Sequence, residues 1–319
     1  MNTPEAIQRQ ADMFGNRVRK TFRHMRKAMA RASIEAYRLY DRDIPELRLV
    51  VDWYAGHAVL GEYVRDQTDV PEFLPAMAKA LADALEIPLT HIHVKQRRTG
   101  ARGHRYERLE RKGERLEVRE GDLTFLCNLD DFIDTGLYAD HRLTRQLVRD
   151  EANGADFLNL YSYTGAFTVA AAKGGARATT SVDASQQYLD WARDNLEQNG
   201  LGGPQHTFAA IDALQWLDWA RRAGHRFDLA WVDPPSYSAN RAQGREFDVL
   251  RDHRALLEAT IEVMQPDGII FFSTNHQRFV PDLEGLPATV TDISAQTLPV
   301  DYRNQHVHRV WRLNLALPV

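Results

Sequence analysis

Residues 156–183 constrain the fold of this chain more than any other stretch. An apolar run over 157–161 leads into a polar turn with one glycine, Gly165, and then into a helix of small residues. A second β-branched run ends at Asp183. This order predicts a parallel βαβ unit whose turn faces a ligand. Asp183 follows the glycine at roughly the 20-residue interval at which an acidic side chain reaches a nucleoside ribose. The stretch therefore predicts a nucleoside-cofactor site.

The rest of the C-terminal half alternates between strand and helix patterns. Strands are predicted at 157–161, 178–183, 206–211, 227–233 and 268–274, and helices at 166–173, 185–199, 213–223 and 247–264. This alternation is typical of a doubly wound parallel α/β sheet. Two late β-rich stretches, 288–298 and 306–317, lack a long helix between them, so we expect them to pair antiparallel at one edge.

The N-terminal part has a different pattern. Residues 14–35 predict a basic amphipathic helix, and strands, a helix at 71–86 and a hairpin over 116–127 follow. These elements predict a smaller α+β domain before the sheet. We therefore divide the chain into a basic helix at 1–36, a candidate RNA-binding domain at 37–134 and a cofactor domain at 135–319.

Composition limits the size of the hydrophobic core and the cellular compartment to be expected. The 319 residues are 44% hydrophobic, enough for one large core and a smaller one. The single cysteine, Cys127, rules out a disulfide framework and fits a reducing compartment, and no metal is expected. No apolar run is long enough to cross a bilayer and the N-terminus is too polar for a secretory signal, so we expect a cytoplasmic protein without a membrane partner.

Charge is unevenly distributed, although the net charge is only −4. Basic side chains crowd two segments of the N-terminal half and predict contact with a polyanion. The alternative, a solvated helix face whose basic side chains lie at its rim, stays open. The candidate RNA-binding residues are Arg17, Arg19, Lys20, Arg23, Lys27, Lys95, Arg97, Arg98, Arg102 and Arg105.

Ligands of doubly wound sheets lie at the carboxyl ends of the strands, and three successive strands here each end in aspartate: Asp183, Asp212 and Asp233. Any one of them has helix capping as an alternative role. The first turn lacks G-x-G-x-x-G, which disfavours a dinucleotide and a dehydrogenase. S-adenosylmethionine has no phosphate to bind. Asp183 would accept from its ribose, Asp212 from its adenine amine, and Arg142 and the loop amides would face its methionine end.

The run Asp233–Tyr237, DPPSY, is the most specific local signal. Pro234 and Pro235 fix the backbone and leave carbonyl acceptors beside the Asp233 carboxylate. Such acceptors suit a planar nitrogenous base, on which Tyr237 would stack. A rigid strand-exit turn is the structural alternative.

Five segments together resemble the K domain of the bacterial 23S ribosomal RNA methyltransferase K/L family, and more distantly the family that methylates carbon five of cytosine in the same RNA. They are NLYSYTGAFTVAAAKGGARATTSVDAS, DPPSYS, FDVLRDH, FGNRVRKTFRHMRK and YRLYDRDIPELRLVVDWY. The resemblance implies a class I methyltransferase (Rossmann-like) sheet. It implies that S-adenosylmethionine is held by Asp140, Arg142, Asn159, Ser162, Tyr163, Thr164, Gly165, Asp183, Ala184, Ser185, Asp212, Ala213 and Asp233.

The resemblance also implies the reaction, methylation of the seven-nitrogen of a guanine in 23S rRNA. Catalysis would rest on Asp233, Pro234, Pro235 and Tyr237, with S-adenosylhomocysteine as product. In the fused enzyme a second methyltransferase and an RNA-binding module precede the K domain. RNA docking is therefore expected to depend on the basic N-terminal half or on a separate partner methyltransferase or RNA-binding protein.

Alternative functions differ in the chemistry they need. Methylation of cytosine carbon five needs a thiolate, and Cys127 lies in a predicted strand of the small domain. Methylation of an exocyclic amine stays open, since DPPSY would serve it equally well. A non-catalytic RNA-binding or ribosome-assembly protein is disfavoured by the three strand-end aspartates. Free RNA and a ribosomal precursor both stay open as substrates.

Overall fold

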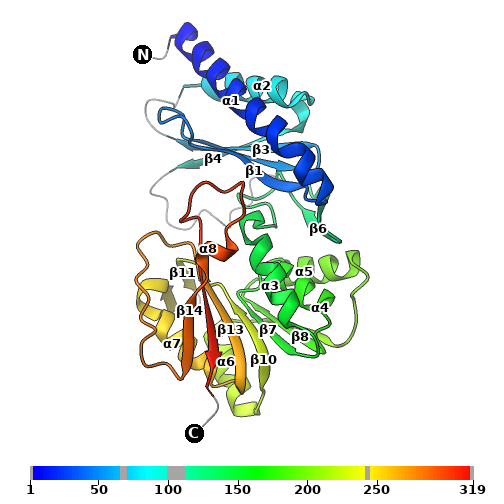
Figure 1. The fold of residues 1–319 in the computed structure, drawn as a ribbon, viewed down its shortest axis with the longest axis vertical. Coiled ribbons are helices and arrows are strands. Elements are labelled where there is room, and N and C mark those ends of the chain that lie inside the picture. The colour runs from blue at the N-terminus through cyan, green and yellow to red at the C-terminus, as the bar shows by residue number, and fades with distance from the viewer. Residues whose placement is uncertain (1–2, 65–69, 99–111, 241–244, 317–319) are drawn as a thin grey trace. The chain divides into compact units, whose positions relative to one another are not determined.

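The computed structural model describes residues 3–64, 70–98, 112–240 and 245–316. The chain divides into two compact units (Figure 1). The first unit comprises Met1–Ala139 and Val300–Asn304, and the second comprises Asp140–Pro299 and Gln305–Val319.

The second unit is built on a seven-stranded sheet of order β14-β15-β13-β10-β7-β8-β9. β7, β8, β9, β10 and β13 run parallel, whereas β15 is antiparallel to both β13 and β14. The doubly wound sheet and the antiparallel pairing of the late strands are thus confirmed. The strands are β7 (Asp156–Leu160), β8 (Ala178–Asp183), β9 (His206–Ala210), β10 (Phe227–Val232), β13 (Met264–Thr274), β14 (Ala288–Asp292) and β15 (Arg309–Leu315).

Helices cover both faces of this sheet, with α3, α4 and α5 on one side and α6 and α7 on the other (Figure 1). Because side chains alternate along a strand, Phe157 packs under α3 and α4 while Leu158 packs under α6 and α7. Phe167 of α4 stacks on Trp231 of β10 with ring centroids 3.7 Å apart. The helices are α3 (Arg142–Glu151), α4 (Ala166–Lys173), α5 (Gln186–Gln198), α6 (Ala213–Ala223), α7 (Val249–Ile261) and the short α8 (Ser294–Thr297).

The order of the strands reverses between β7 and β10, and this switch point is where ligands of such sheets bind. The turn from β7 into α4 has an unusual backbone there. Gly165 has a φ of 72°, and a Cβ built on it would lie 2.5 Å from the Cβ of Ala192 on α5. Glycine is therefore required both by the backbone angle and by the close approach of α5.

The first unit has a four-stranded sheet, β1 (Ala36–Asp41), β2 (Leu49–Tyr54), β3 (His57–Val64) and β4 (Ile92–Arg98), in that order. Two helices, α1 (Pro4–Arg31) and α2 (Phe73–Leu85), pack on one face of the sheet. A separate hairpin joins β5 (Leu116–Glu120) to β6 (Leu123–Cys127), with Cys127 buried as predicted. The short helices η1 (Leu89–His91) and η3 (Ala139–His141) complete the main elements.

Two predicted helix boundaries are wrong. α1 begins at Pro4, ten residues before the predicted start, with the Thr3 hydroxyl accepting from the Ala6 amide at 3.3 Å. The helix predicted at 247–264 is shorter: β12 (Arg245–Asp248) pairs with β11 (Tyr237–Asn240) before it, and β13 already begins at Met264. Among the described helices, none combines the length and apolarity needed to cross a bilayer.

Candidate active site

Asp183 links two elements at the carboxyl edge of the sheet. Its Oδ2 accepts from the Tyr163 amide at 3.0 Å, and its Oδ1 accepts from the Ser185 amide at 2.9 Å. Ser185, not Asp183, caps α5, so capping does not account for this carboxylate. Burial raises the pKa of Asp183, while the two amides favour the charged form. Each oxygen keeps a lone pair for a further donor, as a ribose diol would supply.

The end of β7 and the loop that leads into α4 contain strained residues and unsatisfied polar atoms. Tyr161 and Tyr163 have φ angles of 58° and 48°, a left-handed conformation that non-glycine residues adopt only at a cost. Asn159 Oδ1 and Ser162 Oγ are buried and have no hydrogen-bond partner within the part of the chain that the structure describes. Buried polar atoms are nearly always paired, so these two atoms fit a bound polar ligand.

Other atoms at this edge of the sheet have structural roles. Asn159 Nδ2 donates to Thr168 Oγ1 at 2.9 Å, which ties β7 to α4. The Thr164 carbonyl accepts from Asn195 Nδ2 of α5 at 2.8 Å. Ala184, beyond the end of β8, is exposed and lies between Asp183 and Ser185.

Asp212 caps α6 by accepting from the Gln215 amide at 3.1 Å, so the capping alternative holds for this residue. The next residue, Ala213, packs its side chain into the core and offers a ligand only its backbone. Sequence reasoning missed Tyr161 here. Burial, followed by the charges of Asp212 and Asp183, raises the pKa of Tyr161 above its ordinary value, so its hydroxyl stays protonated.

Asp233 follows β10, the strand on the other side of the switch point. Its side chain is 25% exposed, and desolvation by the surrounding protein raises its pKa to about 7. The negative charge of Asp140 acts in the same direction. Pro234 is buried and Pro235 partly so, while Tyr237 begins β11 with 44% of its surface exposed.

Two histidines that sequence reasoning missed lie beside these carboxylates. His141 Nε2 is 3.9 Å from Asp233 Oδ2 and 4.0 Å from Asp140 Oδ2. His308 Nδ1 is 2.9 Å from Asp140 Oδ2, and the two imidazole rings stack with centroids 4.0 Å apart. No local pattern announces this pairing, because 168 residues separate Asp140 from His308.

The remaining residues of the motifs have mixed positions. Arg142 is the first residue of α3 and is buried. In FDVLRDH, Asp248 caps α7 by accepting from the Leu250 amide. His253 Nδ1 donates to the Val249 carbonyl, while its Nε2 accepts from the Asp282 amide, so both nitrogens are used within the fold. That motif is therefore structural in these positions.

The basic candidates fall into four groups. Lys20, Arg23 and Lys27 are exposed on α1. Arg17 is partly buried and pairs with Asp43 at 2.5 Å, and Arg19 bonds Asn16 Oδ1 at 2.9 Å.

The prediction that Lys95 contacts RNA is wrong, because its side chain is buried and its ammonium donates to the carbonyls of Phe132 and Ile133. Its charge is therefore unavailable to a polyanion. Arg102, Arg105 and the side chains of Arg97 and Arg98 lie outside the described residues.

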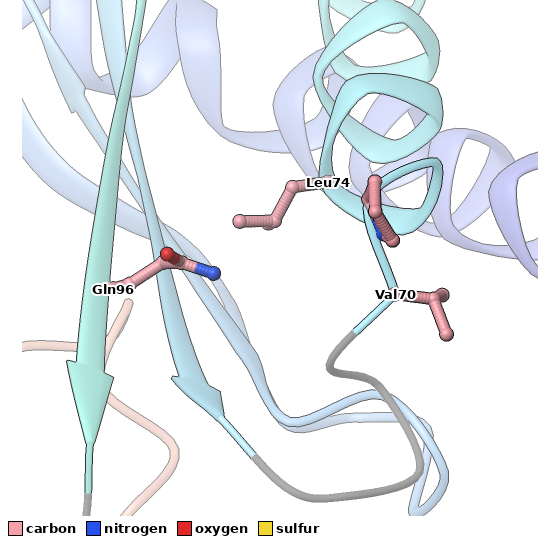
Figure 2. Close-up of a pocket in the computed structure, with 4 residues that line it drawn as sticks. Val70, Leu74 and Gln96 are labelled. Atoms are coloured by element: carbon pink, nitrogen blue, oxygen red, sulfur yellow. The ribbon is translucent and has the colours of Figure 1, made fainter.

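A pocket of 410 Å³ lies in the first unit, between the start of α2 and β4 (Figure 2). Figure 2 shows Leu74 and Gln96 on opposite sides of it. Gln96 Nε2 donates to Oε2 of the buried Glu62 at 3.0 Å. None of the residues assigned to the cofactor lines this pocket.

Comparison with known proteins shows to which family these residues belong. The family described as S-adenosylmethionine-dependent methyltransferase matches residues 37–297. The ribosomal RNA large subunit methyltransferase K/L of Allochromatium vinosum is 42% identical over 318 residues, covering 97% of this chain and 43% of that protein. The protein of the same name from Shewanella loihica is 40% identical over 315 residues, covering 96% of this chain and 44% of that protein. The chain thus spans less than half the length of these relatives.

A solved structure gives a matching fold. The crystal structure of SMU.776 complexed with SAH superposes with a TM-score of 0.78, over 96% of this chain and 82% of that chain. Sequence identity is 22%, so this likeness concerns the fold.

Proposed function

Because the chain belongs to the S-adenosylmethionine-dependent methyltransferases, we propose that its second unit methylates a guanine of 23S ribosomal RNA at the seven-nitrogen. The observation that carries this proposal is the carboxyl edge of the sheet. There Asp183 bridges a strained loop to α5, and Asp233 follows the strand across the switch point.

The residues fit the cofactor. Asp183 would accept from the ribose hydroxyls with its remaining lone pairs. The buried Asn159 Oδ1 and Ser162 Oγ, which lack partners in the described chain, would be satisfied at the same edge. Asp212 keeps one oxygen for the adenine amine after capping α6, and Asp140 and Arg142 would serve the methionine end.

Methyl transfer to the guanine seven-nitrogen needs alignment of the two reactants rather than a general base. Bound S-adenosylmethionine supplies an electrophilic methyl group. The guanine seven-nitrogen carries a lone pair and no proton, so no general base is required, and positive charge develops on the base. Asp233 and the carbonyls of Pro234 and Pro235 would accept from the base N–H groups, and the carboxylate would stabilise that charge. The exposed ring of Tyr237 would stack on the base.

Two observations support RNA as the substrate. The relatives that match nearly the whole chain are named ribosomal RNA large subunit methyltransferases. The exposed Lys20, Arg23 and Lys27 of α1 offer phosphate contacts in the first unit. Because those relatives are more than twice as long, we also propose that a further methyltransferase or RNA-binding module cooperates with this chain on free RNA or on a ribosomal precursor.

The test is methylation of 23S rRNA and of large-subunit precursors with labelled S-adenosylmethionine, followed by digestion to nucleosides. We expect 7-methylguanosine, and chain cleavage at that nucleotide after borohydride and aniline treatment. Asp233→Ala should abolish the product at saturating cofactor, whereas Asp218→Ala on the exposed face of α6 should not. A different methylated nucleoside would refute the seven-nitrogen assignment.

A second candidate, methylation of an exocyclic base amine, is favoured by one observation. The pKa of Asp233, raised to about 7 by burial, suits a group that takes up the proton an amine loses. This reaction would yield N2-methylguanosine or N6-methyladenosine in the same digest. Carbon five of cytosine is disfavoured, because the chain's one thiol, Cys127, is fully buried in the first unit.

A further inference from the structure

His308 lies just before β15 and is almost completely buried, with both ring nitrogens in hydrogen bonds. Its Nδ1 is 2.9 Å from Asp140 Oδ2, and its Nε2 is 3.0 Å from Thr297 Oγ1. The sequence around His308 does not indicate that it contacts Asp140 and Thr297.

The hydrogen bonds of Thr297 determine where the protons lie. Thr297 Oγ1 is also 2.9 Å from the Ser294 carbonyl oxygen, which accepts and cannot donate. The one hydroxyl hydrogen therefore points to Ser294, and Thr297 accepts from His308 Nε2–H. Two lone pairs at 2.9 Å would repel, so a second proton lies between His308 Nδ1 and Asp140 Oδ2. His308 and Asp140 thus form an ion pair that has no net charge and shares the proton between Nδ1 and Oδ2.

This arrangement disfavours a metal ion. Asp140, His141 and His308 each offer a ligand atom within 4.8 Å of the others. However, both nitrogens of His308 are engaged by Thr297 and Asp140. The His141 ring is stacked 14° from parallel, so the in-plane lone pairs of the two rings do not converge.

The pair lies next to the carboxylate assigned to the methyl acceptor. His141 stacks on His308, and its Nε2 is 3.9 Å from Asp233 Oδ2. Burial, and then the charge of His308, lowers the pKa of His141, so this ring is neutral, and Arg145 adds to that effect. The charge of Asp140 favours protonation of Asp233, whereas the charge of His308 opposes it.

We propose that His308 is a positioning residue for methyl transfer: as the cationic partner of Asp140 it holds that carboxylate in place and balances its charge, so that Asp233 ionises more readily than it would beside an uncompensated Asp140. The inference rests on the proposed role of Asp233. Within the described parts of the chain, Asp140, His141 and Asp233 interact with His308, and Thr297 lies on its far side. The cationic Arg145 acts on the stacked His141.

The test compares charge balance in two variants. His308→Gln leaves Asp140 uncompensated, and we expect the titration of Asp233 to move to higher pH by about one unit. Adding Asp140→Asn removes the extra charge, and the titration should return close to that of the unmodified protein. His306→Gln, an exposed neighbour, is the matched control and should not change it.

Two readouts separate this inference from the proposed function. Carbon-13 NMR of the Asp233 carboxyl follows its titration in the protein without any substrate, and the pH profile of kcat at saturating S-adenosylmethionine follows activity. Nitrogen-15 NMR should show a proton on each ring nitrogen of His308.

An unchanged Asp233 titration in His308→Gln, or a double variant that fails to restore it, would overturn the inference. If the NMR titrations shift as expected while the pH profile of kcat does not follow, the charge balance between His308 and Asp140 stands but the role of Asp233 in methyl transfer is refuted.

A second variant covers loss of folding. If His308→Gln does not fold, Thr297→Val removes the Nε2–H acceptor while keeping the Asp140 contact. It should move the Asp233 titration upward by a smaller amount, and Thr297→Ser, which keeps the hydroxyl, should not. Equal titrations in the valine and serine variants would also overturn the inference.

Discussion

Asp183 accepts hydrogen bonds from one amide in the loop after β7 and from one at the start of α5. Its loss should therefore weaken cofactor binding and alter the loop at the same time. Asp183→Ala is expected to weaken S-adenosylmethionine binding by about 10- to 100-fold, the usual cost of losing hydrogen bonds to a charged group. Calorimetric titration measures this. Asp190→Ala, on the exposed face of α5, is the control and should bind normally. Equal affinities would remove Asp183 from the site.

Asp233 should make stability depend on pH. Burial raises its pKa from 3.8 to about 7, so between these values the native state holds a proton that the unfolded state has lost. The free energy of unfolding therefore falls as pH rises through this window and levels off above it. Asp233→Asn should unfold with a free energy about 1 kcal/mol higher than the unmodified protein at pH 8. Urea unfolding at pH 5 and pH 8 checks this, and no gain at pH 8 would contradict it.

At the residue scale, sequence reasoning worked where the signal was local. The strand-end positions of Asp183 and Asp233 were predicted correctly because each residue comes at the end of a buried apolar run. His308 was missed because its partner is 168 residues away. Lys95 was assigned to RNA because a basic run does not show which strand side chains point inward.

The turn from β7 to α4 predicts a specific stability effect. Gly165→Ala combines a left-handed φ with a Cβ 2.5 Å from that of Ala192, and should destabilise by about 2 to 4 kcal/mol. Gly224→Ala, with a φ of 77° and no atom within 4 Å, isolates the backbone cost and should lose about 1 kcal/mol. Urea unfolding compares them. Ala192→Gly should recover part of the loss in Gly165→Ala, and no recovery would show that the close contact is unimportant.

Element types were predicted better than their ends. The strands and helices of the second unit follow from apolar periodicity, which burial on both sheet faces enforces. The start of α1 was missed although Thr3 and Pro4 form a capping signal, because only the periodic part of the helix was used. The helix at 247–264 was extended because the β11–β12 hairpin has no apolar pattern of its own.

Across the whole molecule, the basic face of α1 should govern RNA affinity. Substituting Lys20, Arg23 and Lys27 with alanine removes three exposed charges and should lower the slope of log affinity against log salt by about 2 to 3. Filter binding of an rRNA fragment at several salt concentrations measures the slope. Alanine at Arg193, Arg221 and Arg222 of the second unit removes as many charges and should leave it unchanged. Equal slopes in all three proteins would mean that RNA is bound elsewhere.

The fold class followed from the sequence because the doubly wound alternation admits few topologies. The contacts of His141 and His308 with Asp233 and Asp140 did not, since they depend on which strand neighbours which in the finished sheet.

The place of β15 between β13 and β14 has a consequence for the order in which the protein matures. The ribosome synthesises β15 after the six other strands of the sheet. Among the described strands, β15 is the one that joins β14 to the rest of the sheet. A nascent chain that has produced the cofactor loop and the DPPSY turn therefore still lacks both the sheet edge and His308. The candidate site becomes complete only after residues 308–315 have been added to the chain and have taken their place in the sheet.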